Sequence, residues 1–139
     1  MYLDDGPILA RKMAAQRRSD ALMDLCSRAC PAIAEQFQPF EKYCGPVDVS
    51  VTLTNHDSAQ ITAGFRYRQP HGPTLAFTAS VRRHGADLVL VHRRGSAPIA
   101  VPEPGCIALA FLDAVAAQAE RAFEAIVLGE PWRLRHIFL

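Results

Sequence analysis

The sequence predicts an α+β fold of two layers, in which a four-stranded antiparallel sheet is covered on one face by an N-terminal and a C-terminal helix. Residues 47–82 alternate apolar and polar side chains through three successive runs, and a period of two is typical of strands with one buried face. Apolar residues recur at helical spacing before these runs, over residues 22–37, and after them, over residues 107–128. The predicted order of elements is therefore α-β-β-β-β-α in a single domain, residues 1–139.

The N-terminal third of the chain predicts helix. We expect residues 1–18 to be a loosely attached segment that becomes helical from Pro7, a residue tolerated in a first turn. A second helix begins with Ser19 as its N-cap. Pro31 either kinks this helix or begins another one, and Gly45 then turns the chain into the first strand.

The strand register follows from the requirement that buried side chains face buried partners across each hairpin. The expected pairs are Leu53 with Ile61, Tyr67 with Leu75, and Val81 with Leu88 across a turn at His84 and Gly85. This register places Asp48 opposite Arg66 and Arg82 opposite Asp87 on the solvent-facing side. Two cross-strand ion pairs thus follow from a register that was chosen by apolar parity alone.

The fourth strand is apolar on both faces, unlike its three neighbours. Outward-facing valines on an edge strand need cover, which residues 132–139 could supply within the chain or a second copy could supply between chains. Residues 95–105 read as a loop, and the early alternation of residues 132–139 is also compatible with a fifth strand. The interface hypothesis therefore comprises Val89, Val91, Trp132, Leu134 and Phe138.

Basic residues gather at one end of the predicted sheet, because in an antiparallel meander the second and fourth strands both finish at that end. Guanidinium groups there could make forked hydrogen bonds to a phosphate or carboxylate. Arginines are also ordinary solubilising residues of half-exposed strands, so both interpretations stay open. The candidate anion-binding residues are Arg66, Arg68, His71, His92, Arg93 and Arg94.

We assign no catalytic residue, metal ligand or cofactor from the sequence. His56, Asp57 and Ser58 are consecutive on a tight loop, which does not suit the relay of a hydrolase triad. The spacing of Cys26 and Cys30 differs from the two-residue spacing that is typical of structural zinc sites. The aromatic side chains of the strands are expected to point to the buried face, so the open face of the sheet offers no platform for stacking bases. Nucleic-acid binding is therefore disfavoured.

Composition indicates where such a protein would work. The net charge is +1, and the chain holds no apolar run of bilayer length and no signal-peptide pattern. We therefore expect a cytoplasmic protein without membrane attachment, and the preference for arginine over lysine suggests a bacterial source. The expected function is a non-catalytic binding or adaptor protein that acts through contacts with a protein partner or as a homodimer. The alternative is a small-ligand or anion-binding domain, or an enzyme, that uses the arginine and histidine cluster.

Overall fold

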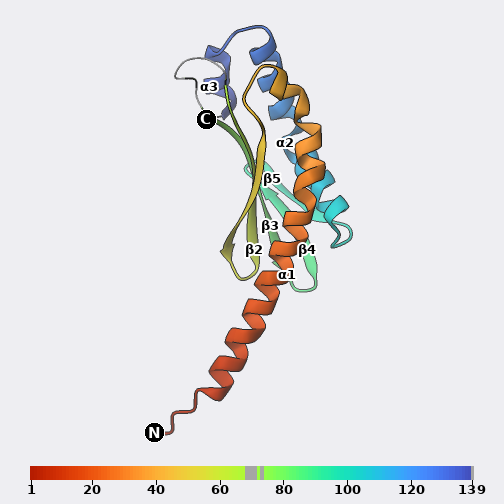
Figure 1. Cartoon of the computed structure of the whole chain (residues 1–139). Helices are drawn as coiled ribbons and strands as arrows, with labels where there is room; N and C mark the ends of the chain where they lie inside the picture. The colour runs from red at the N-terminus through yellow and green to blue at the C-terminus, as the bar shows by residue number, and fades with distance from the viewer. Residues whose placement is uncertain (68–71, 73, 139) are drawn as a thin grey trace.

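The computed structural model describes residues 1–67, 72 and 74–138. An N-terminal helix is followed by a five-stranded antiparallel sheet and then by two further helices, so the predicted α+β fold is confirmed (Figure 1). The elements are α1 (Gly6–Gln36), η1 (Gln38–Lys42), β1 (Asp48–Asn55), β2 (Ser58–Arg66), β3 (Thr74–His84), β4 (Asp87–His92), β5 (Gly95–Ile99), α2 (Pro104–Val127) and α3 (Trp132–Phe138).

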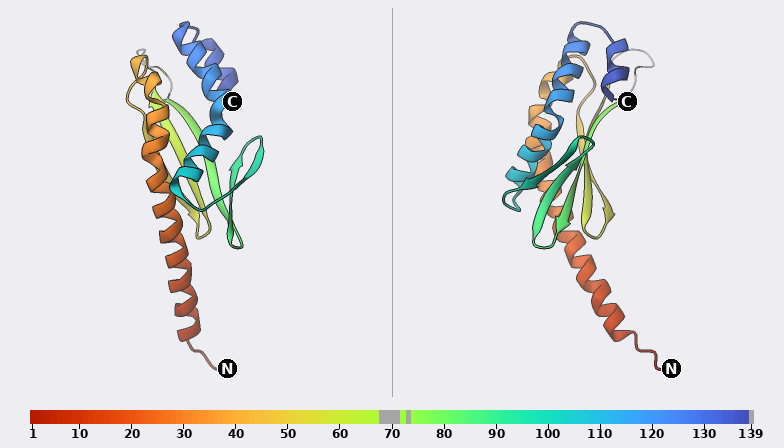
Figure 2. Two further views of the ribbon diagram at one scale, coloured as in Figure 1. Left: turned by 90° about the vertical axis from the view of Figure 1, so that its right-hand side faces the viewer. Right: turned by 180° about the vertical axis from the view of Figure 1, so that it is seen from behind.

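The helices and the sheet share one core. The strands pair in the order β1-β2-β3-β4-β5, and α1 and α2 lie on the same face of this sheet (Figure 2). Helix α1 packs on β1 and β2, whereas α2 packs on β3, β4 and β5. The aromatic centre of the core joins Phe40 of η1 to Phe65 of β2 and Phe123 of α2, with ring centroids 4.8 Å and 5.1 Å apart.

The strands bury the predicted face, but their pairing register differs from the prediction. Buried residues alternate with more exposed ones along β2 and β3. Each predicted hairpin pairing is displaced by two residues: the observed pairs are Val51 with Ile61, Phe65 with Leu75 and Val81 with Leu90. A shift of two residues keeps every side chain on its own face of the sheet, so the apolar pattern is equally compatible with both registers. The geometry of the turn then determines which register forms. Asp48 therefore faces Gly64, and Arg82 faces Val89.

Helix α1 is continuous, which corrects the prediction of a helix start at Ser19. Ser19 is instead buried inside the helix, and Pro31 lies on an exposed side of it. The apolar stripe that faces the sheet continues beyond Pro31 to Ile33. Burial of this stripe outweighs the loss of one backbone hydrogen bond at the proline.

The fifth strand is β5 rather than the C-terminal tail. Residues 95–99 were expected to be part of a loop because of their proline content, but Pro98 is tolerated because β5 is an edge strand. The tail forms α3, whose Leu134 and Ile137 are buried at helical spacing. Phe138 packs against Phe77 with ring centroids 5.0 Å apart and the rings tilted, which holds α3 on the helix-covered side of the sheet.

The first half of α1 projects beyond the sheet (Figures 1 and 2). A helix of 31 residues is about 46 Å long at 1.5 Å per residue, whereas the eight residues of β1 span about 26 Å. The helix therefore overhangs the hairpin on which it packs. We call the overhanging residues 6–18 the α1 arm. No helix in the described part of the chain is both long and apolar enough to cross a bilayer.

Candidate functional site

The structure places the predicted anion-binding residues in two separate regions. Arg66 ends β2 on the open face of the sheet, where its carbonyl oxygen accepts a hydrogen bond from the Gly45 amide (2.8 Å). His92, Arg93 and Arg94 lie at the end of β4. Arg68 and His71 lie outside the described residues. Among the described members of the predicted set, only the three residues of the β4 group lie together.

The residues that end β4 meet two helices at a small concave surface, which we call the basic pocket. Its volume is about 140 Å³, and none of its described lining residues is acidic. The lining residues are His92, Arg93 and Arg94 after β4, Gln118 and Arg121 from α2, and His136 and Ile137 from α3.

Sequence reasoning missed the contribution of the helices. Gln118 and Arg121 are three residues apart and therefore share a face of α2, and that spacing was the available signal. The Gln118 side-chain nitrogen donates a hydrogen bond to the carbonyl oxygen of Ile137 (2.9 Å), which fixes α3 against α2. This bond brings His136 to the rim of the pocket.

The pocket is electropositive. Burial lowers the pKa of His92 from its ordinary value, and the adjacent charges of Arg93 and Arg94 lower it further. Within the described residues, Arg94 and Arg121 form no ion pair. The positive charge of these two side chains is thus not compensated by a carboxylate of the protein.

The predicted interface residues fall on opposite sides of the sheet. Val89 and Val91 are half-buried on the open face, and the tail does not cover them. Trp132, Leu134 and Phe138 instead line a groove of about 860 Å³ on the helix-covered side. Trp132 is 66% exposed at its rim, whereas Leu134 is buried. The structure therefore brings the three tail residues together, but it does not bring them to the valines.

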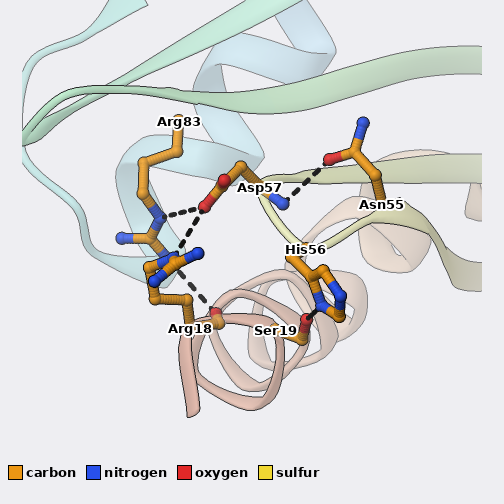
Figure 3. Close-up of polar contacts among 6 residues, drawn as sticks. All are labelled: Arg18, Ser19, Asn55, His56, Asp57 and Arg83. Carbon is orange, nitrogen blue, oxygen red and sulfur yellow. Dashed lines mark hydrogen bonds and ion pairs between the residues drawn. The ribbon is translucent and has the colours of Figure 1, made fainter. Parts of the chain in front are cut away.

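A polar cluster fastens the β1–β2 turn to the point where the arm leaves the body (Figure 3). The Asp57 carboxylate lies 3.2 Å from Arg18 Nε of α1 and 3.5 Å from Arg83 Nε of β3. Arg83 also donates a hydrogen bond to the Arg18 carbonyl oxygen (3.3 Å), and the Asn55 side chain accepts one from the Asp57 amide (2.8 Å). We call this cluster the α1 junction.

The same cluster contains a serine–histidine pair. Ser19 Oγ lies 2.8 Å from His56 Nδ1, which is the distance of a hydrogen bond. A hydrolase triad also needs a carboxylate on the imidazole and an accessible hydroxyl. Figure 3 shows the Asp57 carboxylate directed to the two arginines, and Ser19 is buried. The arrangement suits attachment of the turn to α1 rather than catalysis.

The cysteines do not form a metal site in the part of the chain that is described. No three side chains of His, Cys, Asp or Glu gather there as potential ligands. Burial raises the pKa of Cys26 to about 12, and the neighbouring Cys30 adds to this effect. Cys26 is therefore a protonated thiol at neutral pH.

Comparison of the chain with protein-family models, with curated proteins and with solved structures found no match. The α1 arm with its junction and the basic pocket are the two candidate functional surfaces of the described residues.

Proposed function

We propose that this protein is a non-catalytic binding protein that acts through protein–protein contacts, and that the α1 arm is its contact surface. The observation that carries this proposal is the exposure of three large apolar side chains on a projecting helix: Ile8, Leu9 and Met13 are 57%, 48% and 61% exposed. The arginine-rich composition supports a bacterial source, and four cysteines with no disulfide between them support a cytoplasmic setting.

A purely solvated arm would not need these side chains. Helices on the surface of a globular protein keep their apolar residues on a covered stripe. Leu9 and Met13 are four residues apart and therefore form one ridge on the arm. Nothing in the described part of the chain covers them, since residues 1–13 are all exposed. A partner helix is the simplest cover for such a ridge.

The charges of the arm favour a second copy of this chain, bound antiparallel. Acidic Asp4 and Asp5 precede the bases of the arm, the last of which before the junction is Arg17. Antiparallel pairing about residue 11 puts Leu9 of one copy level with Met13 of the other, and Asp5 level with Arg17. Parallel pairing would instead align like charges, which repel.

The test is the solution mass over a range of protein concentrations, measured by light scattering and sedimentation. The wild-type chain should show a dimer that dissociates on dilution, because a short helical contact is a small interface. The double variant Leu9→Asp/Met13→Asp should remain monomeric. Leu109→Asp is the matched control, because Leu109 is 63% exposed on α2 and away from the arm; this variant should dimerise like the wild type.

A cross-linking experiment tests the direction of pairing. In an antiparallel dimer, Leu9→Cys protein should form disulfides with Met13→Cys protein in preference to itself, whereas a parallel dimer reverses this preference. Peptide mass spectrometry separates these products from those of the native cysteines. A wild-type chain that is monomeric at every concentration, or an arm variant that still dimerises, would contradict the proposal.

A further inference from the structure

We infer that the basic pocket binds the phosphate group of a small molecule. Hydrogen-bond donors converge on the pocket from three elements: the end of β4 supplies His92, Arg93 and Arg94, α2 supplies Arg121, and α3 supplies His136. Guanidinium and imidazole groups are the side chains that most often recognise phosphate oxygens. This site is distant from the arm, so the inference does not depend on the proposed dimer.

The basic pocket places two arginines in one hollow without a carboxylate partner among the described residues, whereas four arginines elsewhere in the chain have one. Arg18, Arg28, Arg83 and Arg133 each lie within 4.0 Å of a carboxylate. In contrast, Arg94 and Arg121 have no carboxylate partner among the described residues, although both line the same hollow. Holding like charges close together is unfavourable, and a bound anion would remove that repulsion.

The size of the pocket restricts the ligand to a compact group. Its volume of about 140 Å³ lies below the roughly 300–1,000 Å³ of typical small-molecule sites. It can hold a tetrahedral oxyanion and a few waters, given about 30 Å³ for each water. A phosphate also suits the directions of the donors, because its oxygens accept hydrogen bonds on all sides. A planar carboxylate, by comparison, is satisfied by a single guanidinium fork.

A neighbouring hollow suggests what the phosphate is attached to. This second hollow, of about 220 Å³, shares His92 and Arg94 with the basic pocket and is also lined by Leu90, Ala97 and Ala114. An apolar group bonded to the phosphate could lie there. A phosphate monoester with a small organic part would therefore occupy both hollows, whereas inorganic phosphate would occupy only the first.

Calorimetric titration of the full chain with inorganic phosphate and with phenyl phosphate tests the inference. Both should bind at one site per chain, and phenyl phosphate should bind more tightly if the second hollow takes its ring. Arg94→Gln/Arg121→Gln should weaken binding of both at least about tenfold, since each hydrogen bond to a charged group contributes that much or more. Arg135→Gln is the matched control, because Arg135 is exposed on α3 but does not line the basic pocket.

The relative affinities for the two ligands and the effects of the variants distinguish the possible outcomes. Equal affinity for the two ligands would leave the phosphate site standing and assign it to inorganic phosphate. No saturable binding to the wild-type chain, or equal weakening by Arg135→Gln, would overturn the inference, because the effect would then come from net charge. Both pocket arginines are exposed, so we expect the double variant to fold. If it does not, the single variants carry the same expectation, and thermal unfolding with and without phosphate gives an independent readout.

Discussion

Asp57 is the residue that links the arm to the rest of the molecule. Its carboxylate faces Arg18 of α1 and Arg83 of β3, two residues that are 65 positions apart in the chain. Arg83 Nε is buried without a hydrogen-bond partner among the described residues, and the Asp57 carboxylate 3.5 Å away offsets part of its lost hydration by charge attraction. A half-buried carboxylate shared by two arginines should therefore contribute more to stability than an exposed pair.

Asp57→Asn should lower the free energy of unfolding by about 1 kcal/mol, because the two charge-assisted contacts are lost while the size of the side chain is kept. Asp24→Asn is the matched control, since Asp24 pairs with Arg28 at 3.7 Å and both side chains are 65% exposed. Its effect should stay within about 0.5 kcal/mol. Urea unfolding measures both, and equal effects would mean that the α1 junction contributes no special stability.

Single residues were also where sequence reasoning was least complete. His56 and Asp57 form the predicted turn, whereas Ser58 begins β2; the serine that meets His56 is Ser19, 37 positions away. Arg121 is the only basic residue between positions 107 and 128, so nothing near it in the sequence connects it to the end of β4. Local patterns cannot show such pairs, because they depend on which elements pack together.

At the scale of elements, apolar periodicity predicted the two long helices and the faces of the strands, but not α3, and the turns set the pairing of the strands. The β3–β4 hairpin shows the difference. His84 pairs with Asp87, so the turn residues are Gly85 and Ala86, and Gly85 has a φ of 61°. The predicted turn placed His84 first and Gly85 second. The need for positive φ selects glycine, and this choice moves the whole register by two residues.

Gly85→Ala should destabilise the protein by about 1 kcal/mol, because an L-residue in this left-handed conformation is strained. A methyl group at Gly85 would meet no other atom within 4 Å, so crowding does not contribute. Gly105→Ala in the first turn of α2 should have the opposite effect on stability. It also has open space, lacks positive φ, and should stabilise the protein by about 0.5 kcal/mol. Thermal unfolding of both variants would show whether the two glycines differ in sign.

For the whole molecule, the packing of α1 on the sheet buries Cys26, and the free energy of unfolding should therefore fall at alkaline pH. Cys26 is fully buried, and its pKa is raised to about 12 from 9.0. A thiol whose pKa is raised by folding contributes stability that is present below the unfolded value and is lost as the pH rises above it. The loss should therefore begin near pH 9 and continue toward pH 12.

Between pH 8 and pH 10.5, the wild-type chain should lose about 1–2 kcal/mol more of its free energy of unfolding than Cys26→Ala does. The variant is less stable at pH 8, because it leaves a small cavity, but its pH dependence should be flatter. Urea unfolding at each pH measures both curves. Parallel curves would show that Cys26 ionises as easily in the folded state as in the unfolded state.

The layered architecture could be predicted from the sequence, but the shape of the molecule could not. The overhang of α1 depends on the difference between the helix length and the length of β1, and the sequence does not say where a docked helix leaves its sheet. The basic pocket is assembled from β4, α2 and α3, so it required the placement of the tail as a helix. Both candidate sites thus depend on tertiary arrangement, which periodicity does not encode.

The overhang of α1 has a consequence for valency. The arm leaves the body at the end far from α3 (Figure 1). The basic pocket lies beside α3, at the other end of the molecule. Two arms paired antiparallel would form a short rod with a sheet body at each end and both pockets facing outward. Such a particle would bind two phosphate ligands, one at each end, and pairing of the arms would leave both sites open, because neither pocket lies at the contact between the chains.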